Sequence, residues 1–288
     1  MTDNTPAGSA EPLRYAAFTA DPAGGNPAGV VLDATALSGE QQLAVAARLG
    51  YSETAFLGPV PGQPRTRTVR YFSPLAEVPF CGHATIAAAV ALGEAIGPGE
   101  LLFETKAGPV PVTVERSAAG EFTATLTSVP PHVEPVAAED LAQALDALRW
   151  KAAELDPELP PVIAYAGARH LVIAAATRAR LADLDYDFDA LAALMRRLDL
   201  VTLQLVWEQD ATTFHVRDPF PVGGVVEDPA TGAAAAAFGA YLRELRGLDD
   251  ARLTLHQGED LGRPGLLTVG LTAGDPRVRV TGRAVRIP

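Results

Sequence analysis

Two short polar segments of the sequence combine residue types that can move a proton or hold an anion. The first runs from Glu77 to His83 and contains Cys81, and the second is Glu227-Asp228 followed by Pro229. Each leads into a run of small apolar residues typical of a helix, with Pro229 suited to a first helical turn. A helix start presents unpaired N–H groups and a positive dipole end, which together bind a carboxylate or phosphate. We therefore expect a small anionic substrate at these two helix starts.

Each candidate side chain also has an ordinary structural explanation. Asp228 before a proline resembles a common helix N-cap, and His83 suits a hydrogen-bonded core or surface histidine. Glu53 precedes a predicted strand and could be a loop carboxylate, while Cys81 beside Phe80 could be a small buried hydrophobe. None of these residues is diagnostic when it is taken alone.

The motifs of several common enzyme classes are absent from the sequence. It has no G-x-S-x-G elbow, H-E-x-x-H pair, phosphate-binding P-loop or G-x-G-x-x-G after a strand. Its five histidines, at positions 83, 132, 170, 215 and 256, include no pair with metal-ligand spacing on one helix. Cys81 is the only cysteine, so a mechanism that needs two thiols in one chain is excluded. We expect carboxylate, imidazole and backbone dipoles to act without a cofactor or a metal.

Composition narrows the class of protein further. The chain has 288 residues, 48% of them hydrophobic, and a net charge of -12. This length favours two domains with sizeable cores, and an acidic chain without a Lys/Arg run is a poor nucleic-acid binder. Residues 1–12 lack the pattern of a signal peptide, and the apolar runs are too short to span a bilayer. We expect a cytoplasmic protein without membrane or nucleic-acid partners.

Apolar periodicity predicts alternating strands and helices in both halves. Ser38 to Gln41 matches a capping box, and the helix after it should end at Gly50. A second helix should begin near residues 82–84 and end by Gly93, and another should run from Pro229 to about residue 242. Strands are predicted at 15–18, 29–32, 54–57, 68–72, 101–104, 110–115, 122–126, 163–165, 171–174, 201–207, 213–216, 253–255, 266–271 and 278–280, and a further helix at 188–198.

The second half repeats the element order of the first. Residues 84–93 and 230–239 are identical at seven of ten positions when they are aligned 146 residues apart, and Pro74 and Pro219 lie 145 residues apart. The pattern breaks at residues 127–135. We infer two similarly folded lobes, 1–128 and 129–288, with the last strand free to pack with the N-terminal lobe.

Six motifs in this order resemble the PhzF-like family of phenazine-biosynthesis isomerases and their relatives. The resemblance implies an α+β fold like that of diaminopimelate epimerase. Such a fold has two pseudo-symmetric lobes of mixed sheet, each wrapped around a central helix, with the site in the cleft between them. It also implies a homodimer. The motifs are Gly25 to Val30, Ser52 to Phe56, Phe80 to Thr85, Arg169 to Leu171, Glu227 to Gly232, and Gln257-Gly258 with Gly262 to Pro264.

The same resemblance implies roles for individual residues. Glu53 matches the family's proton-transferring glutamate, and His83 and Asp228 match residues that contact the substrate. Cys81 matches the first thiol of the two-thiol epimerases, but the second lobe has no partner for it. The phenazine enzymes carry a serine where this chain has Ala233, which argues for a different substrate. The residues implied in substrate binding are Asn26, Gly82, Ala84, Thr231, Gly232 and Ala233.

The function expected from these features is a cofactor-independent isomerase or epimerase that moves a proton within a small carboxylate, with Glu53 as acid and base. Two alternatives remain at this stage. A non-catalytic binding protein for an amino or cyclic acid would retain the cleft but would not need an acid/base at Glu53. A metal-dependent hydrolase is disfavoured by the histidine spacing.

Overall fold

The computed structural model describes residues 11–288 in two compact units. Unit 1 comprises the chain up to Leu126 together with Gly282–Pro288, and unit 2 is Thr127–Thr281. Residues 1–10 of the polar N-terminal segment lie outside the described part. No helix within residues 11–288 is both long enough and apolar enough to cross a membrane.

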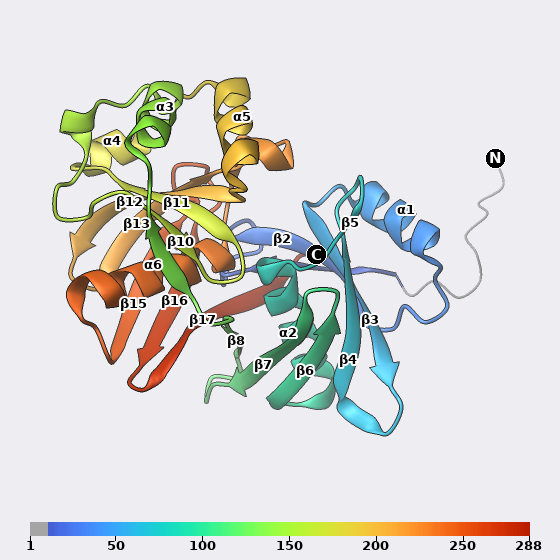
Figure 1. Ribbon diagram of the computed structural model, residues 1–288. Helices are drawn as coiled ribbons and strands as arrows, with labels where there is room; N and C mark the ends of the chain where they lie inside the picture. The colour runs from blue at the N-terminus through green and yellow to red at the C-terminus, as the bar shows by residue number, and fades with distance from the viewer. Residues whose placement is uncertain (1–10) are drawn as a thin grey trace. The chain divides into compact units, whose positions relative to one another are not determined.

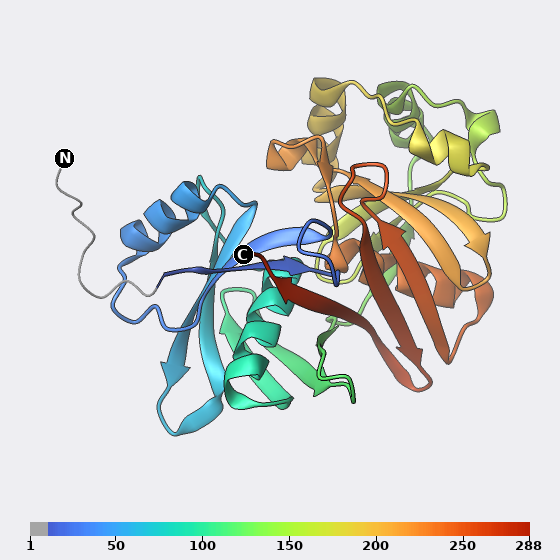
Figure 2. The same cartoon turned by 180° about the vertical axis from the view of Figure 1, so that it is seen from behind.

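Unit 1 is a mixed sheet around one buried helix. Its strands pair in the order β17, β1, β2, β3, β4, β6, β7 and β8, and only the β2–β3 and β4–β6 neighbours are parallel. Helix α2 packs against β1, β2, β3 and β7 (Figures 1 and 2). The elements are β1 (Leu13–Ala17), β2 (Asn26–Val31), α1 (Gly39–Leu49), β3 (Glu53–Val60), β4 (Gln63–Phe72), β5 (Glu77–Val78), α2 (Gly82–Ile96), β6 (Gly99–Thr105), β7 (Gly108–Arg116), β8 (Phe122–Thr127) and the end of β17 (Asp275–Arg286).

Unit 2 repeats this sheet, with the order β9, β10, β11, β12, β13, β15, β16 and β17. The parallel pairs of unit 2 are β11–β12 and β13–β15. They occupy the same positions in the strand order as the parallel pairs β2–β3 and β4–β6 of unit 1. Helix α6 packs against β9 to β12 and β16 (Figure 1). The elements are β9 (His132–Pro135), α3 (Ala138–Leu148), β10 (Val162–Tyr165), β11 (Arg169–Ala174), α4 (Arg178–Ala182), α5 (Phe188–Leu198), β12 (Thr202–Asp210), β13 (Thr213–Pro219), β14 (Glu227–Asp228), α6 (Gly232–Arg246), β15 (Ala251–Gln257) and β16 (Gly265–Thr272).

Local sequence signals predicted many of these elements well. Each predicted strand is present, and α5 has the predicted bounds. The Ser38 side chain accepts from the Gln41 amide while Gln41 accepts from the Ser38 amide, and Gly50 ends α1 with φ 71°. Helix α3 was missed, because Ala137 at its N-cap supplies no capping side chain.

The repeat is real, but its predicted register is wrong by one helical turn. Helices α2 and α6 both contain fifteen residues and begin at Gly82 and Gly232, which lie 150 residues apart rather than 146. With the corrected register, Glu77 matches Glu227 at the start of the two-residue strand that precedes each helix. An alanine-rich helix matches itself almost equally well after a shift of about four residues, because one turn returns to the same face.

Both central helices are surrounded by protein. The eleven residues from His83 to Gly93 are all buried, as are the nine from Ala234 to Leu242. Small residues let the sheets approach these helices closely. A Cβ on Gly93 would lie 2.6 Å from Val114 Cγ1, and one on Gly239 would lie 2.5 Å from Val269 Cγ1. These distances are too short for a real contact, so both positions need glycine for packing.

We predict that Gly93→Val destabilises the protein by about 2 kcal/mol or more, because the added side chain overlaps a stiff β-branched neighbour in a filled core. Ala95→Val, at an exposed position of the same helix, should cost less than about 1 kcal/mol. Urea denaturation measures both free energies of unfolding. Equal losses in the two variants would contradict the packing explanation.

Candidate active site

Glu53, Cys81 and His83 form a compact cluster in unit 1. Glu53 Oε2 lies 3.4 Å from His83 Nε2 and 3.4 Å from Cys81 Sγ. Cys81 Sγ lies 3.4 Å from His83 Nδ1 and 3.8 Å from His83 Nε2. The Glu53 side chain is 16% exposed and that of His83 is 6% exposed. A carboxylate, a thiol and an imidazole therefore share one partly buried position.

Strand pairing explains how Glu53 comes to this position. Strands β2 and β3 are parallel neighbours, with Ala28 opposite Glu53, so their N-terminal ends meet at one edge of the sheet. Asn26 begins β2 and is 1% exposed. Its amide Nδ2 lies 3.1 Å from His83 Nδ1, and Ser52 Oγ lies 3.2 Å from His83 Nε2. Because the Asn26 side-chain amide donates to His83 Nδ1, the proton of the neutral His83 ring is on Nε2. This N–H faces Ser52 and Glu53.

The start of α2 supplies further donors to the same cluster. Cys81 is the N-cap residue, but its side chain does not cap the helix. The Thr85 hydroxyl donates to the Cys81 carbonyl at 2.6 Å and contacts the Tyr71 hydroxyl at 2.6 Å, which anchors the first turn to β4. The first-turn amides, including those of Gly82 and Ala84, have no acceptor within the helix and suit a substrate carboxylate.

An ion pair holds the two-residue strand that precedes α2. Arg70 on β4 donates from Nε and Nη2 to the two carboxylate oxygens of Glu77, both at 2.8 Å. Lys106 adds a contact of 2.5 Å from the other side. Hydrogen bonding by Arg70, assisted by Lys106, lowers the pKa of Glu77 to about 2. Glu77 thus fixes the backbone that leads to Cys81.

The corresponding strand in unit 2 corrects two expectations. Asp228 is not a helix cap, because Thr231 is the N-cap of α6 and Gly232 is its first residue. Pro229 therefore lies before the helix and not in its first turn. Strand β14 pairs Asp228 with Asp218 on β13, which keeps this segment extended. Proline also disfavours helical backbone in the residue that precedes it.

A buried hydrogen-bond network positions Asp228. The Thr231 hydroxyl donates to Asp228 Oδ2 at 2.5 Å. Gln257, which is 1% exposed, donates to the Asp228 carbonyl at 2.9 Å and accepts from the Thr231 amide at 2.9 Å. Gly258 has φ +77°, and a Cβ there would lie 2.8 Å from the Pro229 carbonyl oxygen. The Gln257-Gly258 motif therefore supports the Asp228 segment.

Asp218 is a buried acid that the sequence did not single out. It is fully buried, and burial raises the pKa of its carboxyl well above the usual value, with nearby Asp228 and Glu227 adding to the rise. In the amide orientation that satisfies both groups, Gln204 donates to its two oxygens at 2.8 and 3.2 Å. Asp218 lies on β13 between an arginine and a proline, so no local motif marks it.

Unit 2 repeats the ion pair seen in unit 1. Arg217 on β13 donates from Nε and Nη2 to Glu227 at 3.0 and 2.5 Å. The two side chains are only 10% and 1% exposed, whereas Arg70 in unit 1 is 41% exposed. The sequence spacing differs between the two pairs, seven residues in unit 1 and ten in unit 2, which hides the equivalence from a search for repeats.

The remaining substrate-binding candidates in unit 2 lie at the start of α6. Gly232 is buried and Ala233 is half-buried. As in α2, the N-cap side chain does not cap the helix, since the Thr231 hydroxyl donates to Asp228 instead. Each unit therefore brings its own candidates together: Glu53, His83 and Asn26 with Gly82 and Ala84 in unit 1, and Asp228 and Thr231 with Gly232 and Ala233 in unit 2.

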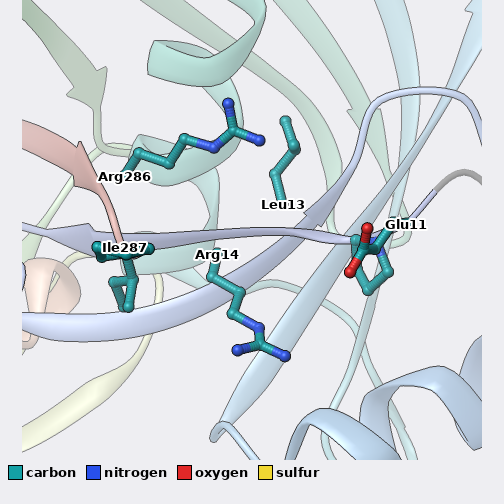
Figure 3. Close-up of a pocket in the computed structure, with 7 residues that line it drawn as sticks. Glu11, Leu13, Arg14, Arg286 and Ile287 are labelled. Carbon is teal, nitrogen blue, oxygen red and sulfur yellow. The ribbon is translucent and has the colours of Figure 1, made fainter.

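A pocket elsewhere in unit 1 contains none of these candidates. It measures about 370 Å³ and lies where the two ends of the described chain meet. Figure 3 shows the guanidinium groups of Arg14 and Arg286 directed to opposite sides, so they do not converge on one anion. Its lining residues are Glu11, Pro12, Leu13, Arg14, Arg286, Ile287 and Pro288.

Sequence comparison identifies relatives over nearly the whole chain. The family described as phenazine biosynthesis-like protein, PhzC-PhzF, matches residues 15–287. The chain is 33% identical over 282 residues to YddE of Escherichia coli K12, which is named as an uncharacterized isomerase, with 93% of each chain covered. It is 30% identical over 265 residues to the trans-2,3-dihydro-3-hydroxyanthranilate isomerase of Pseudomonas aeruginosa, covering 91% of this chain and 90% of the relative.

Solved structures agree with this relationship. A PhzF-family phenazine biosynthesis protein from Bacillus anthracis has a TM-score of 0.86 and 26% identity, with 96% of each chain covered. A probable proline racemase from Agrobacterium radiobacter K84 shares the fold, with a TM-score of 0.64, 16% identity, and 95% and 90% coverage. The protein is thus an isomerase with the α+β fold of racemases and epimerases. It belongs to the PhzF family.

One other motif residue, His170, has a structural position in unit 2. It is fully buried on β11, and its Nδ1 lies 2.8 Å from the Thr202 hydroxyl. Burial lowers the pKa of His170 from 6.5 to about 3. The ring is therefore neutral in the folded protein over the physiological range, in keeping with a core position.

We predict that His170 makes the protein less stable as the pH falls from 6.5 towards 3. The unfolded chain binds a proton at His170 in this window and the folded chain does not, so stability falls with falling pH. This group contributes a slope of at most about 1.4 kcal/mol per pH unit. His170→Leu should remove that component in urea titrations across the window, and His132→Gln, at an exposed histidine, is the control. An unchanged slope in His170→Leu would contradict the prediction.

We predict that replacing the glutamate by glutamine lowers the free energy of unfolding by different amounts in the two ion pairs. Glu227→Gln leaves Arg217 buried without its carboxylate and should destabilise the protein by about 3 kcal/mol. Glu77→Gln should cost about 1 kcal/mol, because water can solvate the more exposed Arg70. Denaturant titration at neutral pH compares the two variants. A greater loss in Glu77→Gln would show that burial does not set the strength of these pairs.

Proposed function

We propose that this PhzF-family isomerase moves a proton within a small carboxylate-bearing substrate, with Glu53 as both acid and base. The observation that carries the proposal is the position of the Glu53 carboxylate, partly buried and 3.4 Å from both His83 Nε2 and Cys81 Sγ at the start of α2. A proton-transferring group must be accessible to substrate and held in one orientation. The 16% exposure of the Glu53 side chain and its contacts with His83 and Cys81 support this role.

The proposed reaction needs no group beyond the chain's own residues. The Glu53 carboxylate takes a proton from a substrate carbon. The electron pair left on that carbon is delocalised into the adjoining carboxylate of the substrate. The first-turn amides of α2 stabilise the negative charge that develops there. Glu53, now protonated, returns the proton to another carbon or to an oxygen of the substrate, on the face from which it was taken. Asn26 holds the His83 ring at Nδ1. When substrate binds, the Ser52 hydroxyl turns away and the Nε2–H of His83 donates to a polar substituent of the substrate.

We further propose that Asp228 binds an amino or hydroxyl substituent, as the family resemblance implies. The hydrogen bonds within unit 2 support this role of Asp228. Thr231 and Gln257 hold Asp228 in one orientation beside the start of α6. Ala233 supplies no hydroxyl at the position where the phenazine enzymes carry serine. We therefore propose a small amino acid, hydroxy acid or cyclic carboxylate other than the Pseudomonas aeruginosa relative's substrate. The homodimer stays a prediction.

A non-catalytic binding protein is not favoured. Such a protein gains nothing from an acid/base group at Glu53, and a glutamine could make similar hydrogen bonds. The relatives are named as isomerases, which also argues for chemistry.

Hydrogen exchange in deuterated water tests the role of Glu53. The protein is incubated with a panel of small amino, hydroxy and cyclic carboxylates, including trans-2,3-dihydro-3-hydroxyanthranilate, and deuterium at carbon is followed by NMR. Glu53→Gln should lower the exchange rate at least about 100-fold, because the base is lost while the shape is kept. Glu40→Gln, at an exposed position on α1, is the matched control and should keep the wild-type rate.

Two results would contradict the proposal. Equal exchange by Glu53→Gln and wild type would remove Glu53 from the chemistry. Binding of a panel member without any exchange by the wild-type protein would favour the non-catalytic alternative.

A further inference from the structure

We propose that Glu53, Cys81 and His83 bind a thiophilic divalent cation such as Zn²⁺, and that this cation inhibits the enzyme. Among residues 11–288 these three form the group of His, Cys, Asp or Glu side chains whose possible ligand atoms all lie within 4.8 Å of one another. The inhibition rests on the proposed role of Glu53, whereas the binding itself does not.

The spacing of the three atoms matches one face of a tetrahedral zinc site. With the usual Zn–S, Zn–N and Zn–O distances, the edges of such a face are about 3.3 to 3.6 Å long. The observed edges are 3.4 Å from Cys81 Sγ to Glu53 Oε2, 3.4 Å from Glu53 Oε2 to His83 Nε2, and 3.8 Å from Cys81 Sγ to His83 Nε2. Small side-chain adjustments therefore suffice to place all three on one ion.

The donor set selects the kind of cation. A thiolate with an imidazole and one carboxylate suits Zn²⁺ or Co²⁺, whereas Mg²⁺ and Ca²⁺ require more oxygen ligands. Two anionic ligands balance the charge of a divalent ion, which matters because Cys81 and His83 are buried. Three protein ligands leave the fourth tetrahedral position for water or a substrate carboxylate.

The surroundings of His83 fit a metal ligand as well. Histidine ligands usually have a hydrogen-bond partner on the ring nitrogen that does not hold the metal. Here Nε2 faces Glu53, and Asn26 lies 3.1 Å from Nδ1. An amide can turn to present its oxygen, so Asn26 can accept the Nδ1 proton when Nε2 binds the ion.

Metal binding and proton transfer exclude one another at this position. When the ion binds, the Cys81 thiol releases its proton to the buffer and the Glu53 carboxylate donates an electron pair to the metal. Glu53 then cannot take a proton from substrate. The cation is thus an inhibitor of the proposed reaction and not a cofactor for it.

Cobalt titration tests the site with a readout that is independent of activity. The full-length protein is treated with chelator and desalted, then titrated with Co²⁺ while absorbance is recorded. We expect one equivalent of Co²⁺ with tetrahedral visible bands and a near-ultraviolet thiolate charge-transfer band, all lost when Zn²⁺ displaces it. Cys81→Ser should abolish the charge-transfer band, and His83→Asn and Glu53→Gln should weaken binding at least about tenfold.

A second histidine cluster provides the matched control. His215 and His256 stack on neighbouring strands of unit 2, with Glu259 Oε2 2.6 Å from His215 Nδ1. His215→Gln should retain the full cobalt spectrum. Absence of stoichiometric Co²⁺ binding, or a spectrum lost in His215→Gln but kept in Cys81→Ser, would overturn the proposal.

The deuterium-exchange assay separates this proposal from the proposed function. Inhibition of wild-type exchange by Zn²⁺, reversed by chelator, supports both. A cobalt spectrum that depends on Cys81, together with exchange that Zn²⁺ leaves unchanged, supports the metal site and contradicts the role of Glu53. Loss of exchange in Glu53→Gln without any cobalt spectrum supports the catalytic role and contradicts the metal site.

Discussion

The rest of this structure depends on the burial of one helix inside each mixed sheet. Residues 83–93 of α2 and 234–242 of α6 are all buried, so only small side chains fit where the sheets approach most closely. A buried helix start also needs partners for its polar backbone groups. In both units the chain leaves these amides without a side-chain cap and surrounds them with polar side chains.

An arginine–glutamate ion pair anchors the segment that leads into each central helix. In unit 1 the pair is Arg70–Glu77, which joins β4 to the two-residue strand β5. In unit 2 it is Arg217–Glu227, which joins β13 to the two-residue strand β14. Both arginines donate from Nε and Nη2, but the Arg217–Glu227 pair is more buried than the Arg70–Glu77 pair. Removing one partner should therefore lower the free energy of unfolding more in unit 2 than in unit 1. The two helix starts also carry different side chains. Unit 1 presents Cys81 and His83 there, while unit 2 presents Thr231 and Ala233.

Local signals predicted the fold better than they predicted the details of the site. The capping box at Ser38 and the amphipathic pattern of α5 are complete within a few residues, so their elements were found. The start of α6 was misplaced because Asp228-Pro229 has the local form of a helix start, whereas pairing with Asp218 decides that it is a strand. The repeat was found in the wrong register because alanine runs match at several offsets.

The amino-acid sequence is sufficient for several conclusions, since they depend on residue identity and order. One cysteine excludes a mechanism that needs two thiols in one chain, and the ordered motifs indicate the PhzF family. Contacts between distant segments required the tertiary structure. Parallel pairing of β2 with β3 and the packing of α2 bring Glu53 to Cys81 across 28 residues. Burial sets the pKa of Asp218, because the loss of water, and not the residue type, disfavours its charge.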